Sequence, residues 1–382
     1  MENKFFPEVR GNLAFGCMRL PMQGTEVDYV EFEKMIKAFF EAGFNYFDTA
    51  HGYISGKSEI AIHDCLTTKY PREKYILTDK LTDSYFKKEE DVVPFFESQL
   101  EILGVDYLDF YLMHAQNREN FKKFKACHAY ETAFKLKEEG KIRHVGISFH
   151  DKAEVLDQIL TEYPEIEVVQ IQFNYLDYED SSVESRKVYE VCERHNKPVL
   201  VMEPVKGGRL VNLPKEADNI LKSLNGGSNA SYAIRFAGSF KNMAVVLSGM
   251  SNLEQMEDNI KSMKDFKPLS HEEFEAVAKV RAVFEGLNLI PCTSCKYCIE
   301  ENECPMKIRI PDMFSSLNMY EAFHDWNSSY YYNDVVVGKN HGRASDCIKC
   351  GKCEKVCPQH LEIRKLLVKV ADAFDQGYEP EE

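Results

Sequence analysis

Residues 141–172 read KIRHVGISFHDKAEVLDQILTEYPEIEVVQIQ, and this stretch joins two short apolar runs through one amphipathic segment. The runs His144–Ser148 and Val168–Gln172 lack strict alternation, which is typical of parallel strands buried on both faces. Between them, Asp151–Glu162 has the apolar spacing of a helix. A strand, a helix and a second strand in this order predict a βαβ unit and a parallel sheet.

The same alternation continues in both directions along the chain. Further strands are predicted at Asn12–Gly16, Phe44–Asp48, Tyr75–Lys80, Leu108–Met113, Pro198–Glu203 and Ala244–Gly249. Further helices are predicted at Glu31–Ala42, Glu90–Leu103, Phe121–Glu139, Ser182–His195, Asn229–Ala237 and Leu253–Met263. Eight strands favour a closed (β/α)₈ TIM barrel. A doubly wound open sheet competes, but it usually carries a G-x-G-x-x-G turn after its first strand, and this chain has none.

Length and composition allow a second module. The chain has 382 residues, whereas an α/β barrel takes about 250. Cysteines and prolines accumulate after about residue 288, so we place a boundary near Gly286–Ile290. We expect a barrel over residues 1–288 and a small α-helical and loop domain over residues 289–382.

Charge and hydropathy restrict the partners. The formal net charge of −15 disfavours nucleic acid. The chain contains no run of 18 apolar residues, so we expect no membrane span. The N-terminal sequence lacks the apolar stretch of a signal peptide, which favours a cytoplasmic protein that acts on a small molecule.

Eight of the twelve cysteines form two motifs. The first is Cys292-x2-Cys295-x2-Cys298-x5-Cys304-Pro305, and the second is Cys347-x2-Cys350-x2-Cys353-x3-Cys357-Pro358. The second motif matches the bacterial ferredoxin run for a [4Fe–4S] cluster. Two zinc sites are the alternative, but zinc usually takes paired C-x2-C knuckles.

The assignment of cysteines to the two clusters depends on the fourth cysteine of each motif. In two-cluster ferredoxins, which residues 289–365 resemble, the fourth thiolate ligates the other cluster. We therefore expect Cys292, Cys295, Cys298 and Cys357 to hold one cluster. Cys347, Cys350, Cys353 and Cys304 are expected to hold the other. The isolated cysteines Cys65, Cys127 and Cys192 are expected to be buried small hydrophobes, whereas Cys17 follows the first strand and is a candidate for the site.

Polar residues at the strand ends form a catalytic constellation. Chemistry in a barrel lies at the C-terminal ends of its strands. Asp48, Lys80 and His114 end the second, third and fourth predicted strands, and Tyr53 follows shortly after the second. A lysine ammonium lowers the pKa of a nearby phenol, so Lys80 is expected to make Tyr53 a proton donor. Asp48 would hold Lys80, and His114 would orient a carbonyl oxygen.

These motifs resemble the aldo-keto reductases over about residues 8–265. Phe47-Asp48-Thr49-Ala50, Tyr53, Thr78-Asp79-Lys80 and Leu112-Met113-His114 correspond to the family's Asp/Tyr/Lys/His tetrad. The resemblance implies a nicotinamide cofactor bound without a Rossmann fold. The residues that it implies for the cofactor are Cys17, Ser148, Gln170, Met202, Glu203, Lys206, Gly207, Gly208, Ser248, Gly249, Met250, Gln255, Asp258 and Asn259.

Two positions depart from the family pattern, and a third feature bears on cofactor choice. Phe149 replaces the Asn that follows the carboxamide-binding Ser, and Met202 stands where many members stack a Tyr on the nicotinamide ring. Residues 248–255 lack the Lys and Arg that pair with a 2′-phosphate, so NADH is favoured over NADPH. The segments 146–151 and 357–363 resemble a subgroup of these reductases with fused ferredoxin-like tails.

Three functions follow from these observations. The first is NAD(P)H-dependent reduction of an aldehyde or ketone. The second is electron transfer from the iron–sulfur clusters to an activated substrate, with flavin as a possible mediator because a hydride carries two electrons and a cluster carries one. The third is a regulatory or binding protein with an inactive barrel. The clusters would feed a mediator, accept electrons from a soluble carrier such as ferredoxin, or brace the tail.

Overall fold

The computed structural model describes residues 3–287, 289–294, 296–300, 304–338, 341–357 and 359–375. The described residues form two compact units. The first unit runs to Val211 and resumes at Asn219–Ala278. The second comprises Asn212–Asp218 and the chain from Lys279 onward.

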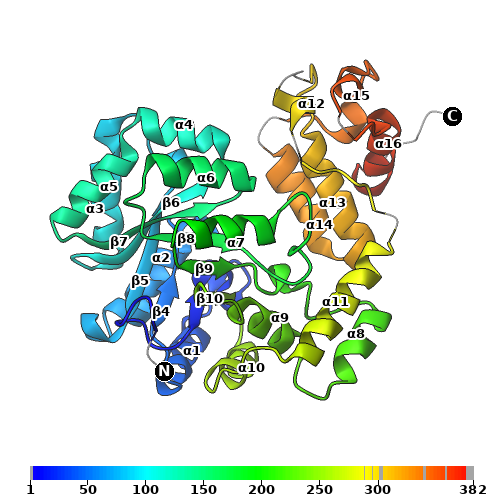
Figure 1. Cartoon of the computed structure of the whole chain (residues 1–382). Coiled ribbons are helices and arrows are strands. Elements are labelled where there is room, and N and C mark those ends of the chain that lie inside the picture. Colours follow the sequence, from blue (N-terminus) through cyan, green and yellow to red (C-terminus); the bar gives the residue numbers. More distant parts are fainter. Residues whose placement is uncertain are drawn as a thin grey trace. The chain divides into compact units, whose positions relative to one another are not determined.

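The first unit is a closed barrel of parallel strands in the order β1-β10-β9-β8-β7-β6-β5-β4, which confirms the predicted fold (Figure 1). The strands are β1 Leu13–Gly16, β4 Tyr46–Asp48, β5 Ile76–Leu81, β6 Leu108–Gln116, β7 Ile142–Phe149, β8 Val168–Gln172, β9 Val199–Met202 and β10 Met243–Gly249. All eight predicted strands are present, with ends that differ by at most three residues. A two-stranded hairpin of β2 (Met22–Gln23) and β3 (Glu26–Val27) was not predicted.

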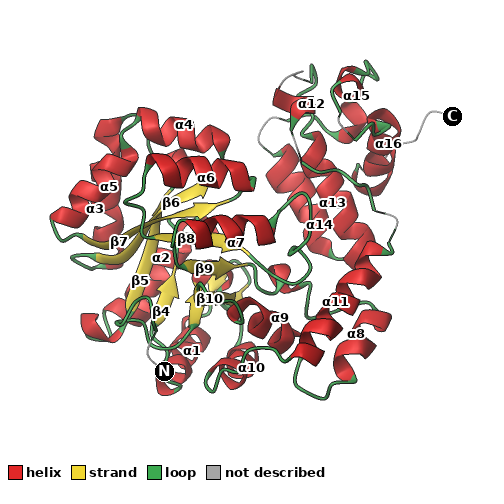
Figure 2. Ribbon diagram, viewed as in Figure 1, coloured by secondary structure: helices red, strands yellow, loops and turns green. Residues whose placement is uncertain are grey.

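Helices surround the strands of the barrel (Figure 2). They are α1 Tyr29–Glu41, α2 Lys57–Ile62, α3 Val92–Leu103, α4 Arg118–Ala126, α5 Ala129–Glu138, α6 Ala153–Glu162, α7 Ser185–Arg194, α9 Asn229–Gly238 and α10 Leu253–Met263. The prediction of one helix over Phe121–Glu139 was wrong, because His128 has a φ of 47° and separates α4 from α5. The left-handed conformation of His128 stops one helix and starts the next.

Alternation along the strands separates the barrel core from the site. Tyr46, Ile76, Leu112, Val168 and Leu200 belong to one buried cluster inside the barrel. Because side chains on a strand point alternately to opposite faces, the residues two positions further along share this inward face. Those residues are Asp48, Thr78, His114, Gln170 and Met202, and Lys80 follows Thr78 by two more positions.

The second unit is helical in the part of it that the structure describes. Its elements include α12 Tyr297–Glu300, α13 Ile310–Phe323, α14 Trp326–Tyr330, a π-helical turn at Tyr331–Val337, α15 Lys352–Lys355 and α16 Ile363–Phe374. The helices α8 Lys215–Lys222 and α11 His271–Glu285 complete the described helices of the chain. The core of the second unit includes Met313, Phe314, Tyr332, Leu367 and Val370. Tyr332 donates its hydroxyl proton to Asp375 and accepts from the amide of Ala344.

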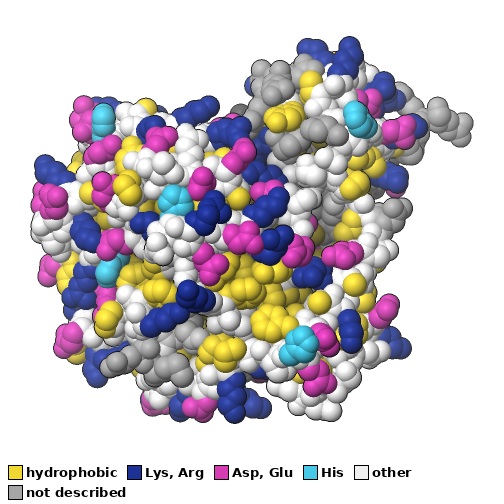
Figure 3. Space-filling view, in the orientation of Figure 1, with side chains coloured by type: hydrophobic (Ala, Val, Ile, Leu, Met, Phe, Trp, Pro, Cys, Tyr) yellow, Lys and Arg dark blue, Asp and Glu magenta, His cyan; other side chains and the backbone are white. Residues whose placement is uncertain are grey.

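Surface and helix character agree with the composition. Acidic and basic side chains are intermixed on the face of the barrel in view (Figure 3). None of the helices in the described part of the chain combines the length and the apolar character needed to cross a membrane.

Candidate active site and cysteine clusters

A buried ion pair forms the base of the candidate active site. Lys80 has no exposed surface, and its Nζ donates to Asp48 Oδ1 at 2.7 Å and to the Thr49 carbonyl at 2.6 Å. Burial alone would lower the pKa of Lys80, but Asp48 and Tyr53 raise it above its usual value. The ammonium group therefore stays charged, as its expected role requires.

Tyr53 lies above this ion pair in a constrained turn. The centroid of its ring is 4.8 Å from Lys80 Nζ. Ile54 and Ser55 have φ values of 52° and 55°, and Gly56 follows at 86°. The left-handed conformation is costly for Ile54 and Ser55, though not for Gly56, and such strain is commonly retained where it positions a functional group.

The pKa of Tyr53 differs from the sequence expectation. Burial raises the pKa of this phenol above its usual value, while Lys80 lowers it through its charge and a hydrogen bond. Lys80 thus acts in the expected direction, but burial outweighs it. The phenol accordingly holds its proton at neutral pH and is available as an acid rather than as a phenolate.

His114 completes the tetrad from the end of β6. Its ring centroid lies 6.1 Å from that of Tyr53, and Nδ1 pairs with Thr82 Oγ1 at 2.6 Å. Burial, followed by Lys80 and His150, holds the pKa of His114 well below its usual range. A neutral imidazole that accepts the Thr82 hydroxyl proton at Nδ1 carries its own proton on Nε2, which makes Nε2 a hydrogen-bond donor.

Two neighbouring amide and hydroxyl groups fit a nicotinamide carboxamide. Gln170 Nε2 donates to Asp48 Oδ2 at 3.1 Å, which leaves its amide oxygen as an acceptor. Ser148 Oγ accepts from the Ala115 amide at 2.8 Å and retains its own proton for donation. Both side chains are buried, and Met202 lies half-buried at the end of β9. A carboxamide needs one acceptor and one donor, and these residues supply both.

The loop after β9 is held by an ion pair beneath it. Lys206 Nζ lies 2.5 Å from Asp177 Oδ1, and Asn174 donates to both Asp177 and the Glu203 carbonyl. Gly207 and Gly208 have φ values of 65° and 94° and form the partly exposed turn of the loop. Burial raises the pKa of Glu203, although Lys206 and Arg19 oppose this shift. The ammonium group of Lys206 is therefore paired with the carboxylate of Asp177.

The segment after β10 is organised by its own polar groups. Asn259 Nδ2 donates to Ser248 Oγ at 2.7 Å, and both residues are buried. Gln255 Oε1 accepts from the Ser251 amide at 2.8 Å, and Asp258 accepts from Ser228. Gly249 is exposed at the strand end. The side chains of Met250 and Cys17 have no exposed surface, so neither faces solvent at the site.

Arg19 is a cation that sequence reasoning missed. A Cβ placed on Gly249 would lie 3.4 Å from Arg19 Cδ, and one placed on Gly207 would lie 3.1 Å from Arg19 Nη2. The Arg19 carbonyl accepts from Ser251 Oγ at 2.9 Å. Arg19 therefore joins the two loops that were expected to bind the cofactor. Its position after the first strand, far from both loops in sequence, carried no motif.

His150 is the second residue that sequence reasoning missed. It follows Ser148 by two positions and so continues the inward face of β7, and its amide donates to the Gln116 carbonyl at 2.9 Å. The residue as a whole is exposed, but desolvation of its ring, followed by the charge of Lys80, lowers the pKa of His150 to about 4. Strand alternation would have found this residue if β7 had been extended beyond Ser148.

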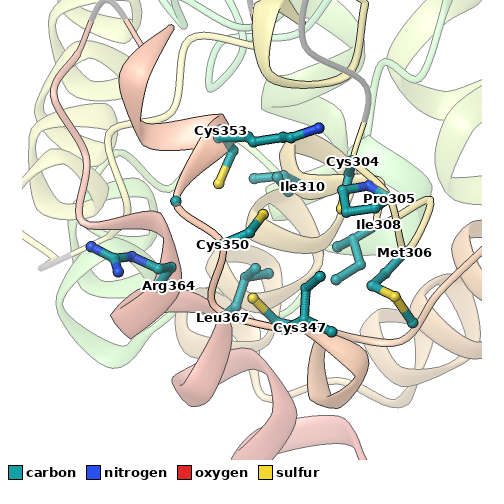
Figure 4. Close-up of a pocket in the computed structure, with 13 residues that line it drawn as sticks. Cys304, Pro305, Met306, Ile308, Ile310, Cys347, Cys350, Cys353, Arg364 and Leu367 are labelled. Atoms are coloured by element: carbon teal, nitrogen blue, oxygen red, sulfur yellow. The ribbon is translucent and has the colours of Figure 1, made fainter.

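Four cysteines of the second unit line one pocket. They are Cys304, Cys347, Cys350 and Cys353, from the segment before α13 and from the region of α15 (Figure 4). Met306, Ile308, Ile310 and Leu367 supply apolar walls. Among the described residues, no three His, Cys, Asp or Glu side chains lie close enough to hold a single metal ion.

The first cysteine motif lies on the same helical core. Cys298 belongs to the core cluster, and Cys292 and Cys357 are partly buried against it. Cys295 lies outside the described residues. Of the isolated cysteines, Cys65, Cys127 and Cys192 are buried, as their expected structural role requires.

Both parts of the chain match known protein families. Residues 12–282 match the aldo/keto reductase family, and residues 291–361 match the 4Fe-4S dicluster domain. The 9,11-endoperoxide prostaglandin H2 reductase of Trypanosoma cruzi (strain CL Brener) is 25% identical over 266 residues, 68% of this chain and 87% of that protein. The NADH-specific methylglyoxal reductase of Escherichia coli (strain K12) is 28% identical over 185 residues, 44% of this chain and 54% of that protein.

Solved structures show the same barrel. The holo form of an aldo-keto reductase from Bacillus halodurans has a TM-score of 0.55 at 24% identity, and the match covers 70% of this chain and 91% of that one. An aldo-keto reductase from Klebsiella pneumoniae in complex with NADPH has a TM-score of 0.57 at 19% identity, with 71% and 90% covered.

A family match over most of the chain, a closed barrel and a tetrad at its strand ends define an oxidoreductase. The chain belongs to the aldo/keto reductase family and carries a C-terminal 4Fe-4S dicluster domain. The resemblance stated from the motifs is thereby confirmed.

Proposed function

We propose that this enzyme reduces an aldehyde or ketone with a hydride from NADH or NADPH. The observation that carries the proposal is the buried Lys80, which is paired with Asp48 and lies 4.8 Å from the ring centroid of Tyr53. A charged lysine without exposed surface is costly to maintain. The position of Lys80 next to the Tyr53 ring suits a role for this lysine in proton transfer from the phenol.

The residues divide the reaction between them. A reduced nicotinamide, when bound, supplies the hydride for the carbonyl carbon. His114 donates from Nε2 to the carbonyl oxygen and orients it. Tyr53 gives its hydroxyl proton to that oxygen as charge develops, and Lys80 stabilises the phenolate that remains. Asp48 and the Thr49 carbonyl keep the Lys80 ammonium in place.

The cofactor residues follow from the same site. Ser148 and Gln170 would hold the carboxamide, and Met202 would pack on the ring. The loop with Glu203, Lys206, Gly207 and Gly208 would cover the pyrophosphate. Ser248, Gly249, Met250, Gln255, Asp258 and Asn259 would hold the adenosine end. NADH is favoured because residues 248–255 offer no Lys or Arg to a 2′-phosphate.

We propose two [4Fe–4S] clusters with the ligand sets inferred from the cysteine spacing. Cys304, Cys347, Cys350 and Cys353 line one pocket, which supports the exchange of the fourth ligand. Cys350 is exposed, and exposure favours electron transfer with a soluble carrier over a purely bracing role. Such clusters suit a reducing compartment, which supports a cytoplasmic location.

The replacement Tyr53→Phe tests the proposal. It removes the proton donor and keeps the ring, so kcat for carbonyl reduction should fall by about 10²–10⁴-fold, the usual contribution of a positioned general acid. Binding of NADH, followed by quenching of protein fluorescence, should stay within about twofold because the hydroxyl is not among the cofactor residues. Steady-state kinetics with a carbonyl substrate of the wild type supplies the readout.

The matched control is Tyr85→Phe, because Tyr85 is an exposed phenol in the neighbouring loop. This control should leave kcat unchanged. Full activity of Tyr53→Phe would contradict the proposed acid and would favour cluster-driven chemistry. In that case flavin bands in the spectrum of the anaerobically purified protein would identify the mediator.

A further inference from the structure

A buried pair of acids lies on the other side of the barrel wall from Tyr53 and Lys80. Asp79 precedes Lys80 in β5, and because side chains alternate along a strand, these two residues point to opposite faces. Asp79 and Glu59 have no exposed surface, and their carboxyl groups are hydrogen-bonded to each other. Neither acid takes part in the proton transfer described above.

Glu59 contacts both segments that carry the proton-transfer residues. It lies in α2, directly after the turn of Tyr53, and its Oε2 lies 2.7 Å from Nδ1 of His51, which precedes that turn. Glu59 Oε1 accepts from Gln99 Nε2 at 3.4 Å, and the same nitrogen donates to the Lys80 carbonyl at 3.2 Å. Glu59 therefore connects the loop of Tyr53 to the backbone of Lys80.

The two acids cannot both be ionised without strong repulsion, because they are in contact and removed from solvent. Burial raises the pKa of both, and the charge of Glu59 raises the pKa of Asp79 further. Lys80 opposes this shift, but burial and Glu59 outweigh it. The other titratable groups that face the pair are His51 in the loop and the phenol of Tyr111 in β6. A single proton between the two acids relieves the repulsion.

The hydrogen bonds indicate which acid holds this proton. Both oxygens of Glu59 have partners, His51 and Gln99, and hydrogen bonds accepted by a carboxylate favour its charged form. Asp79 Oδ1 accepts from the Lys80 amide at 2.7 Å. No donor in the described part of the chain reaches Asp79 Oδ2. A buried carboxylate oxygen without a donor is costly, whereas a protonated Oδ2 can donate to Glu59.

We propose that Asp79 and Glu59 are positioning residues for the proton transfer, joined by a proton that Asp79 Oδ2 donates to Glu59. The pair ties the loop of Tyr53 to the segment of Lys80 and so holds the phenol next to the ammonium group. Neither acid touches the reacting atoms. The inference rests on the proposed carbonyl reduction, since it assigns a role in the same proton transfer.

Infrared spectroscopy of the full chain, purified anaerobically, tests the position of the proton. A carboxylic acid and a carboxylate absorb at different C=O frequencies, and isotopic labelling of the carboxyl carbon shifts the band. At pH 7 the wild type should show a carboxylic acid band that moves when aspartate is labelled and is missing in Asp79→Asn. The control Asp64→Asn, at an exposed aspartate that pairs with His63, should keep the band. Absence of the band, or a band that moves only when glutamate is labelled, overturns the assignment.

The kinetic test compares two replacements of Asp79 that differ in hydrogen bonding. Asp79→Asn keeps a donor towards Glu59 and an acceptor for the Lys80 amide, so kcat should stay close to that of the wild type. Asp79→Leu removes both, and kcat should fall by about tenfold or more, because small displacements of catalytic groups are costly. KM and the dissociation constant of NADH should change by less than about twofold, since neither acid contacts substrate or cofactor.

The outcomes separate a positioning role from a purely structural one. A loss of kcat in Asp79→Leu that is absent in Asp79→Asn supports the proposal. Equal kcat in Asp79→Leu and the wild type overturns it, and so do equal losses in the two variants. If Asp79→Leu does not fold, Asp79→Ala removes the same hydrogen bonds without adding apolar volume. Since the infrared band requires no substrate, a wild type without carbonyl reductase activity would refute the proposed function and leave the shared proton standing.

Discussion

Lys80 illustrates how single residues specify this site. A fully buried ammonium group loses its hydration, and the protein must replace it with fixed partners. Asp48 and the Thr49 carbonyl provide two of them. Asp48 is in turn held by Gln170 through its second oxygen. A residue expected to bind the cofactor thus also positions the ion pair, which couples cofactor binding to the proton donor.

Arg19 gives the first prediction at this scale. Its guanidinium approaches the turn at Gly207, next to the loop expected to cover the pyrophosphate, which NADH and NADPH share. Arg19→Leu should weaken binding of both cofactors by about tenfold, the worth of one charge-assisted hydrogen bond. The proposed preference for NADH over NADPH should be the same in the variant as in the wild type. Fluorescence titration with each cofactor measures both quantities.

A change in the ratio of the two affinities would place Arg19 at the 2′-phosphate instead. Arg186→Leu is the control, because Arg186 is a partly exposed arginine on α7 that pairs with Glu179 and Glu190. It should leave both affinities unchanged. A clear preference of the wild type for NADPH would contradict the inference drawn from residues 248–255.

At the scale of elements, the junction of α4 and α5 stores strain in one residue. His128 is exposed and has a φ of 47°, a conformation that costs a non-glycine residue about 1–2 kcal/mol. His128→Gly should therefore raise the free energy of unfolding by about 0.5–1 kcal/mol, since glycine adopts this φ freely but gains entropy when unfolded. Urea denaturation measures the change.

The control for His128→Gly is a glycine substitution within α4. Lys125→Gly substitutes an exposed position of α4 and should lower the free energy of unfolding by about 1 kcal/mol. Destabilisation by His128→Gly would show that the His128 side chain makes a contact that outweighs its backbone strain.

His144 links β7 to two other segments near the N-terminal end of the barrel. Nε2 lies 2.7 Å from Glu8 Oε1, and Nδ1 lies 3.1 Å from Glu167 Oε1. Burial disfavours its charge, but the hydrogen bonds to Glu167 and Glu8 raise the pKa of His144. Its stabilising contribution is therefore complete below pH 6.5 and is lost as the pH rises through the raised pKa.

Glu167 has the opposite dependence. Burial alone would raise the pKa of Glu167, but hydrogen bonds from His144 and Lys137 lower it to about 2. Its contribution is present above about pH 4.5 and is lost as the pH falls towards 2. The interactions of His144 with Glu8 and Glu167 thus stabilise the fold most between these limits, near pH 5–6.

The prediction is a pH-dependent cost of His144→Gln. The variant should lose about 1–2 kcal/mol more in unfolding free energy at pH 6 than at pH 9, because only the charged ring is held by both carboxylates. Urea denaturation at the two pH values measures this difference. His271→Gln, at a side chain that is 92% exposed, should show none. An equal loss at both pH values would mean that only the packing of the ring against Phe6 and Phe110 matters.

The elements also show what sequence patterns determine. The strands were predictable because parallel strands buried on both faces form compact apolar runs, and the glycines after the helices mark helix ends. The break at His128 was not, since the apolar spacing of α4 continues into α5 and only the backbone angle separates them. The hairpin of β2 and β3 has two residues in each strand, too few for any periodicity.

The candidate site was predictable where motifs sit at strand ends. Asp48, Lys80 and His114 occupy such positions, and Cys347, Cys350 and Cys353 of the pocket belong to the motif with the ferredoxin spacing. Arg19 was missed because it contacts two loops that are distant from it in sequence. His150 was missed because the predicted strand ended at Ser148. The raised pKa of Tyr53 also required the structure, since burial depends on all the residues around the ring.

At the scale of the whole molecule, two chemistries share one chain. In the proposed reaction the tetrad handles a hydride and a proton together, whereas iron–sulfur clusters transfer single electrons. The tetrad lies in the first unit, and the cysteine pocket lies in the second. This separation predicts that damage to one cluster leaves the fold of the barrel intact.

The replacement Cys304→Ala examines this prediction together with the exchange of ligands between the motifs. The wild type should hold about eight iron and eight sulfide per chain, as two [4Fe–4S] clusters require. Because Cys304 lines the pocket with Cys347, Cys350 and Cys353, its loss should destroy that cluster and lower the iron content to about four. Binding of NADH to the barrel should persist.

The matched variant Cys357→Ala should remove the other cluster, and the two variants should then retain clusters with different electron paramagnetic resonance spectra after reduction. A combined variant of Cys304 with Cys347 should resemble the Cys304 variant, because both residues serve one cluster. If instead Cys304→Ala left the spectrum of the second-motif cluster intact and removed that of the first, the ligands would not be exchanged. Zinc in place of iron would reject both clusters.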